Sequence, residues 1–87
     1  MIQKKITILD PIGFHARTAA LFAKKAALFQ ADILIYFNGK KVNGKSTLAL
    51  MTLGVKSQNE IEIYASGEDE KSAMMELTQL IESNFNS

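Results

Sequence analysis

The 87-residue chain contains no cysteine and no tryptophan, and only one proline and one histidine. The lack of cysteine excludes disulfides and thiolate chemistry, and a single histidine argues against most histidine-built metal sites. Ten basic and nine acidic residues leave a net charge of +1, which is not the strongly basic balance of a nucleic-acid binder. No apolar run is long enough for a signal peptide or a membrane span. These absences predict a cytoplasmic protein with no metal and no nucleic-acid partner.

Length and composition predict a single folded domain over residues 1–87. The hydrophobic share is 47% and the charged share 22%, which is normal for a globular protein. A chain of this size buries roughly 60 to 65% of its unfolded surface without cross-links. We expect disorder only in residues 84–87.

Hydrophobic periodicity predicts seven secondary-structure elements. Apolar residues at helical spacing indicate helices, alternating or β-branched runs indicate strands, and Asn38-Gly39 is a strong hairpin signal. The predicted strands are residues 2–8, 32–37, 40–43 and 60–65, and the predicted helices are 16–29, 46–53 and about 70–83. Strands that alternate need only one covered face, which three amphipathic helices can supply. The order β-α-β-β-α-β-α therefore predicts a two-layer α+β sandwich whose other sheet face is open.

The first candidate site is His15, where a loop turns into the first helix, with Arg17 two residues further on. A helix N-terminus has unpaired N–H groups and the positive end of the dipole, so it favours a neutral, nucleophilic ring. Once the ring carried a phosphoryl group, the same N–H groups and the Arg17 guanidinium could bind its oxygens. This arrangement suits a reversible phosphohistidine better than acid–base catalysis. The alternative is that His15 only begins a helix and Arg17 is ordinary surface charge.

Two further candidates follow one another in the sequence. Ser46 is most simply the N-cap of its helix, although added phosphate at a helix N-terminus is electrostatically favourable and could alter a docking surface. Residues 39–46, Gly-Lys-Lys-Val-Asn-Gly-Lys-Ser, match the phosphate-binding P-loop pattern. A P-loop fold needs several parallel strands with crossover helices, and this chain is too short to build them. Asn38-Gly39 also fits a hairpin better, so we expect no nucleotide site here.

Two separated segments resemble the HPr family, the histidine-containing phosphocarriers of the bacterial phosphoenolpyruvate:sugar phosphotransferase system. Gly-Phe-His-Ala-Arg at residues 13–17 resembles the family's active-site signature, and Val-Asn-Gly-Lys-Ser at 42–46, followed by Met-Thr-Leu-Gly at 51–54, resembles its regulatory-serine segment. The similarity spans essentially the whole chain. It implies an antiparallel four-stranded sheet of order 1-4-2-3 with three helices on one face.

The resemblance also implies a function. His15 would accept a phosphoryl group on Nδ1 from phosphorylated enzyme I and pass it to sugar-specific enzyme II subunits, with Arg17 steadying the phosphate. Ser46 would be the target of an HPr kinase/phosphorylase, and the phosphorylated form would bind a catabolite-control transcription factor. The protein would be a monomeric covalent carrier rather than an enzyme, with no cofactor. The alternative is a mainly regulatory module that acts through phospho-Ser46, although such a protein has no need of His15.

A docking surface for these partners is implied near the two motifs. Its expected residues are Thr18, Ala20, Lys24, Thr47, Leu48 and Met51, whereas Leu50 is expected in the core. The chain departs from the family where Thr18 replaces a proline, and we expect the Thr18 hydroxyl to bond a nearby backbone group instead. Thr47 and Ala49 stand where the family has an apolar residue and a glycine, which affects recognition of Ser46 more than the chemistry of His15.

Overall fold

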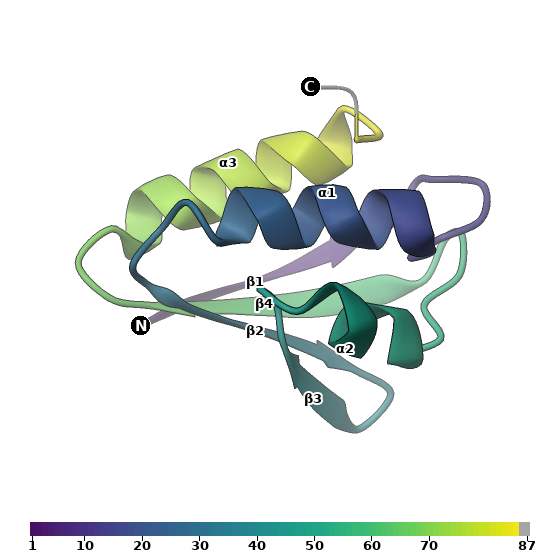
Figure 1. Ribbon diagram of the computed structural model, residues 1–87, viewed down its shortest axis with the longest axis horizontal. Coiled ribbons are helices and arrows are strands. Elements are labelled where there is room, and N and C mark those ends of the chain that lie inside the picture. Colours follow the sequence, from purple (N-terminus) through teal and green to yellow (C-terminus); the bar gives the residue numbers. More distant parts are fainter. Residues whose placement is uncertain (86–87) are drawn as a thin grey trace.

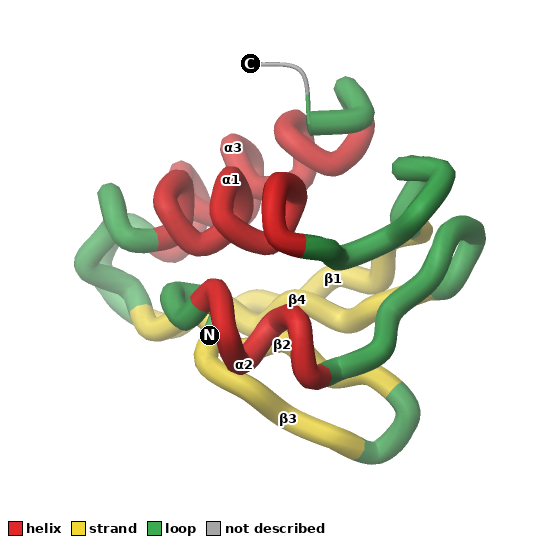
Figure 2. The backbone as a smooth tube through the Cα atoms, turned by 45° about the vertical axis from the view of Figure 1, so that its right-hand side comes forward, coloured by secondary structure: helices red, strands yellow, loops and turns green. Residues whose placement is uncertain are grey.

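Four antiparallel strands form one sheet, in the order β1-β4-β2-β3, in the computed structural model, which describes residues 1–85. The strands are β1 (Ile2–Thr7), β2 (Asp32–Phe37), β3 (Lys40–Asn43) and β4 (Glu60–Ser66), and the helices are α1 (Ala16–Ala26), α2 (Thr47–Thr52) and α3 (Glu70–Glu82). All three helices lie on the same side of the sheet (Figures 1 and 2). The predicted open-faced sandwich, its element order and its strand order are confirmed.

The period of two in the strands decides which side chains form the core. Ile35 lies opposite Ile63 on neighbouring strands, and Ile6 lies opposite Ile61 at the sheet edge. These isoleucines point toward the helices and are at most 8% exposed. The helices contribute Phe22, Leu50, Leu77 and Ile81, all of them fully buried. Each fully buried side chain of this kind contributes about 1.5 to 3 kcal/mol of hydrophobic stabilisation, and Leu50 is a core residue as predicted.

The predicted end of the first helix, at residue 29, is wrong. The first helix stops at Ala26, because the N–H groups of Leu28 and Phe29 bond to carbonyls three residues back in a tightened turn. The helical spacing of apolar residues therefore continues to Phe29, beyond the end of the helix itself. At the C-terminus, Phe85 is ordered: its side chain is 2% exposed and its N–H donates to the Leu80 carbonyl at 2.7 Å. The last two residues, 86 and 87, lie outside the described residues. The Phe85 ring packs against the core, where it contacts Phe14.

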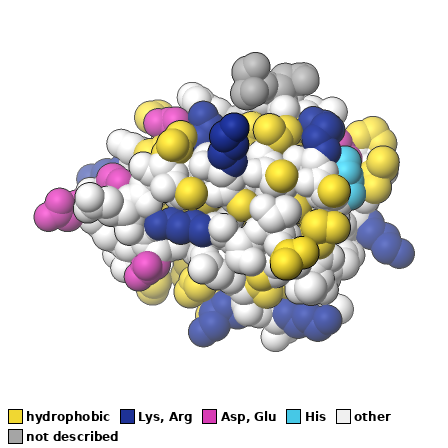
Figure 3. Space-filling model, viewed as in Figure 1, with side chains coloured by type: hydrophobic (Ala, Val, Ile, Leu, Met, Phe, Trp, Pro, Cys, Tyr) yellow, Lys and Arg dark blue, Asp and Glu magenta, His cyan; other side chains and the backbone are white. Residues whose placement is uncertain are grey.

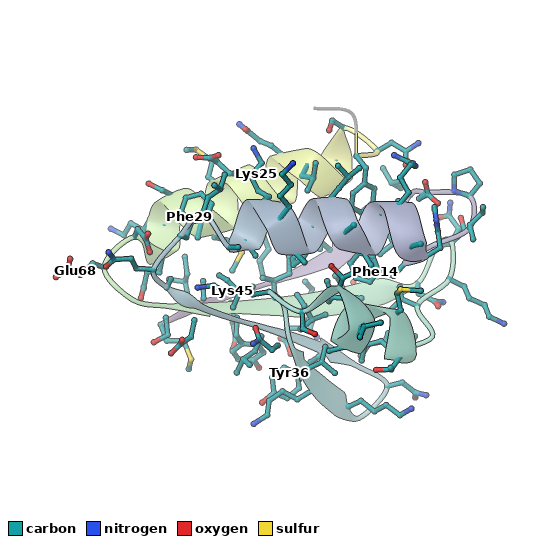
Figure 4. The ribbon with its side chains drawn as sticks, in the orientation of Figure 1. Phe14, Lys25, Phe29, Tyr36, Lys45 and Glu68 are labelled. Carbon is teal, nitrogen blue, oxygen red and sulfur yellow. The ribbon has the colours of Figure 1, made fainter. Side chains whose placement is uncertain are left out.

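The residues that match the P-loop pattern form a hairpin instead. Residues 40–43 pair with β2 as strand β3, which leaves no loop to wrap a phosphate. The Lys45 ammonium donates at 2.8 Å to the carbonyl of Phe29, in the turn that follows α1; Figure 4 labels both residues. Its charge also faces Asp69, whose carboxylate accepts the N–H groups of Gln30 and Ala31 at 2.8 Å each. The Gln30 hydrogen bond is the main reason why the pKa of Asp69 is below its usual value.

Candidate functional site

The loop between β1 and α1 is folded around the carboxylate of Asp10. One oxygen, Oδ2, accepts the backbone N–H groups of Ile12 at 3.0 Å and Gly13 at 3.2 Å. Gly13 has a φ of +97°, and a Cβ there would collide with the Val55 carbonyl oxygen, so only glycine fits. The next N–H, that of Phe14, bonds this same carbonyl at 3.1 Å. The loop between β1 and α1 is thereby hydrogen-bonded to the loop that follows α2, which runs beside it in Figure 1.

Phe14 anchors this loop in the core immediately before the histidine. Its side chain is 6% exposed, and its ring contacts Phe22 of α1 and Phe85 edge-on, with centroids 5.7 and 6.1 Å away. Such aromatic pairs contribute about 0.5 to 1.5 kcal/mol beyond the area they bury. The backbone therefore reaches His15 directly from a residue that is fixed in the core. The two rings that fix Phe14 come from α1 and from residue 85.

His15 is the N-cap residue of α1, and Thr18 holds it there. The Thr18 hydroxyl accepts the His15 N–H at 3.1 Å and donates to the Gly13 carbonyl at 2.7 Å. The prediction that this hydroxyl bonds a nearby backbone group is confirmed. The imidazole remains 29% exposed, so a reacting group can reach it. Because residues 15 and 18 are one helical turn apart, this bond fixes the first turn under the ring.

A buried carboxylate links the two predicted site residues. His15 Nε2 lies 3.4 Å from Asp10 Oδ2, and an Arg17 guanidinium nitrogen lies 3.3 Å from Asp10 Oδ1. The Asp10 side chain is only 5% exposed, whereas that of Arg17 is 56% exposed. Burial raises the pKa of Asp10, but the backbone N–H groups of Ile12 and Gly13 and the charges of His15 and Arg17 outweigh it, so this pKa lies below its usual value.

Sequence reasoning missed Asp10 as a site residue. From the sequence alone, the segment from Asp10 to Gly13 indicates only a turn that ends the first strand. An aspartate followed by Pro, an apolar residue and Gly does predict a side chain that bonds backbone N–H groups two and three residues on. That signal predicts that the carboxylate lies in the turn. It does not predict that the His15 and Arg17 side chains lie close to the same carboxylate.

The chemistry open to this arrangement follows from its parts. The imidazole has one nitrogen facing a carboxylate, and it stands at the N-terminus of an eleven-residue helix, where N–H groups favour an anion. Arg17 supplies an exposed guanidinium that donates a hydrogen bond to the same carboxylate. A nucleophilic ring beside two anion-binding groups suits transient attachment of a phosphoryl group. No cluster of three His, Asp or Glu side chains suited to a metal occurs in residues 1–85.

Ser46 is the N-cap of α2. Its hydroxyl oxygen accepts the Ala49 N–H at 3.2 Å, and its own N–H bonds the Asn43 carbonyl at the end of β3. The structural role predicted for Ser46 is therefore present. The side chain is half-buried, and α2 packs against α1.

The expected docking surface is exposed, with one exception. Leu48 is 76% and Met51 40% exposed, Ala20 and Lys24 are exposed, and Thr47 is half-buried. Thr18 is 0% exposed, so the expectation that its side chain contacts partners is wrong; its hydroxyl is consumed inside the loop. The structure adds Ile12, which is 67% exposed. In Figure 3, hydrophobic side chains flank the cyan histidine on two sides, and basic and acidic side chains lie beside it as well.

Comparison with known proteins places the chain in a family. The family model described as the PTS HPr component phosphorylation site matches residues 2–83. The chain is 42% identical over 81 residues to the phosphocarrier protein HPr of Buchnera aphidicola, covering 93% of this chain and 95% of that protein. It is 39% identical over 82 residues to the HPr-like protein Crh of Bacillus subtilis, covering 94% and 96%.

Solved structures agree with this assignment. The crystal structure of HPr-C-His from Thermoanaerobacter tengcongensis has a TM-score of 0.96 and 41% identity, covering all of this chain and 98% of that one. The fold and the site define a histidine-containing phosphocarrier domain. The chain belongs to the HPr family of the phosphotransferase system. Within residues 1–85 no helix has the length and apolar character needed to cross a membrane.

Proposed function

We propose that this chain carries phosphoryl groups in the phosphoenolpyruvate-dependent sugar phosphotransferase system. His15 accepts the group on Nδ1 from phosphorylated enzyme I and delivers it to sugar-specific enzyme IIA subunits, while Arg17 binds the phosphoryl oxygens. The chain is a substrate of these phosphotransferases and acts as a monomer in the cytoplasm. The observation that carries the proposal is the partly exposed His15 ring at the start of α1, with Asp10 and Arg17 on one side.

The surface around the ring supports transfer between proteins. A carrier must dock on several partners in turn, and exposed apolar side chains beside the nucleophile provide contact area without a deep pocket. Leu48 and Met51 on α2, together with Ala20 and Lys24 on α1, supply such a surface, and Thr47 lies next to them. The partners on this surface would be enzyme I and the enzyme IIA subunits.

A phosphotransfer assay tests the carrier function. The purified protein is mixed with phosphoenolpyruvate and enzyme I, and we expect one acid-labile phosphate per chain, which a sugar-specific enzyme IIA then removes. The variant His15→Ala is expected to take up none, and Ser46→Ala serves as the control that remains labelled at His15. Absence of labelling in the unmodified protein, or labelling that persists in His15→Ala, would refute the proposal.

A second candidate function is regulation through Ser46. Two observations favour it. The chain is 39% identical to the HPr-like protein Crh, and the Ser46 hydroxyl lies at the start of α2, next to the proposed docking surface. In this case an HPr kinase/phosphorylase adds phosphate from ATP, and the product binds a catabolite-control transcription factor. Ser46→Ala should abolish ATP-dependent labelling and regulator binding while His15 labelling continues. Loss of both activities together would instead indicate damaged folding.

A further inference from the structure

We propose that Asp10 is a positioning residue for phosphoryl transfer through His15, an inference that rests on the proposed function. Its carboxylate keeps the ring proton on Nε2, so that Nδ1 holds the free lone pair, and it then stabilises the positive charge that the ring acquires on attack. The same carboxylate forms an ion pair with Arg17 that holds the guanidinium beside the site until a phosphoryl group arrives.

The choice of nitrogen follows from which atom faces the carboxylate. Nε2 lies 3.4 Å from Asp10 Oδ2, and an ionised carboxylate can only accept hydrogen bonds. The N–H groups of Ile12 and Gly13 on this oxygen keep it charged and fix its position. Because the Asp10 side chain is only 5% exposed, its negative charge at this distance favours the N–H at Nε2 over the N–H at Nδ1. The remaining nitrogen is then the nucleophile.

The transfer step creates the charge that Asp10 can neutralise. The Nδ1 lone pair attacks phosphorus, a new P–N bond forms, and the P–N bond to the donor's phosphohistidine breaks, with its electron pair returning to the donor ring. No proton leaves His15, so a ring phosphorylated on Nδ1 and protonated on Nε2 is a cation. A buried carboxylate facing the N–H of such a ring stabilises the transition state that leads to it.

Arg17 is held by the other oxygen of the same carboxylate. Its guanidinium lies 3.3 Å from Oδ1 and is 56% exposed, whereas Asp10 itself is nearly inaccessible. The incoming phosphoryl group is a stronger anion, and Arg17 can rotate toward it through solvent. When Arg17 moves to the phosphoryl group, the positive charge of the new imidazolium replaces that of Arg17 beside Asp10. The net charge around Asp10 therefore changes little during transfer.

Two substitutions separate these roles, and a third is a matched control. Asp10→Ala removes the carboxylate. Asp10→Asn can keep an oxygen at the Oδ2 position, where Ile12 and Gly13 donate to it, while it loses the charge and presents an NH2 group to Arg17. Asp32→Asn changes an exposed carboxylate at the first residue of β2. Because His15 is the only histidine, nitrogen-15 NMR of the imidazole reports its tautomer without assignment problems.

We expect the unmodified protein and Asp32→Asn to show the neutral Nε2–H tautomer and the same transfer rate from phosphorylated enzyme I. Asp10→Ala should show mixed tautomers and a transfer rate lower by at least about tenfold. Asp10→Asn should keep the Nε2–H tautomer yet lose rate, because the charge is gone. Thermal unfolding of each variant identifies any that fails to fold, and Asp10→Asn then carries the test.

The inference is overturned if the unmodified protein has its proton on Nδ1, or if both Asp10 variants transfer phosphate at the unmodified rate. These results differ from a failure of the proposed function, in which the unmodified protein takes up no phosphate at all. The tautomer measurement needs no enzyme, so it tests Asp10 independently of the assay.

Discussion

Replacing Thr18 with valine is expected to destabilise the protein strongly for a change of one hydroxyl to one methyl. Thr18 is fully buried, and its hydroxyl makes two backbone bonds, from the His15 N–H at 3.1 Å and to the Gly13 carbonyl at 2.7 Å. Valine has nearly the same shape but leaves both groups unsatisfied. An unsatisfied buried polar group costs about 1 to 3 kcal/mol, and the His15 N–H is only partly buried. We therefore expect a net loss of about 2 kcal/mol.

Denaturant and thermal unfolding measure this loss. For a domain of this size, 1 kcal/mol corresponds to roughly 4 to 8 °C in Tm, so Thr18→Val should melt about 8 to 16 °C lower. The matched control is Thr52→Val, which removes a hydroxyl that donates to the Ala49 carbonyl at 2.6 Å on an exposed helix surface. Water replaces that bond, so the control should lose less than about 0.5 kcal/mol. Equal losses in the two variants would refute the argument that burial makes the Thr18 bonds important.

Three other predictions follow from the same structure. Gly13→Ala should lower the free energy of unfolding by about 2 kcal/mol or more and slow His15 labelling, because its Cβ would displace the Val55 carbonyl; unchanged melting would contradict this. Asp69 has a folded pKa below its unfolded value of 3.8, so its contribution is present above that pH and is lost as pH falls through the lower folded pKa. The melting temperature should therefore fall on acidification below about pH 4, and less steeply in Asp69→Asn. Lys45→Met should cost about 1 kcal/mol by removing the bond to the Phe29 carbonyl, and neither form should bind ATP in calorimetry.

Much of the architecture could be predicted because it depends on local patterns. Alternating Ile61 and Ile63 and the apolar stripe through Phe22 state which face each element buries, and Asn38-Gly39 states where the hairpin turns. Element ends were less predictable. The last predicted turn of the first helix is replaced by a tighter turn, in which the N–H of Phe29 bonds to a carbonyl three residues back. Phe85 packs on Phe14, a residue 71 positions earlier in the chain. Neither outcome is encoded in the spacing of neighbouring residues.

The sequence by itself determined that one histidine stands at a helix start beside an arginine, in segments that resemble a phosphocarrier family, and that Ser46 begins a second helix. Those features are local, since capping and periodicity act within a turn or two of helix. Only the tertiary structure decided that Asp10 lies between His15 and Arg17, that Thr18 is buried, and that Lys45 bonds the Phe29 carbonyl in the turn after α1. The contacts of Asp10 and Thr18 exist because the turn at Gly13 and the carbonyl of Val55 direct the β1–α1 loop back on itself. Contacts between residues brought together in this way cannot be inferred from neighbours in the chain.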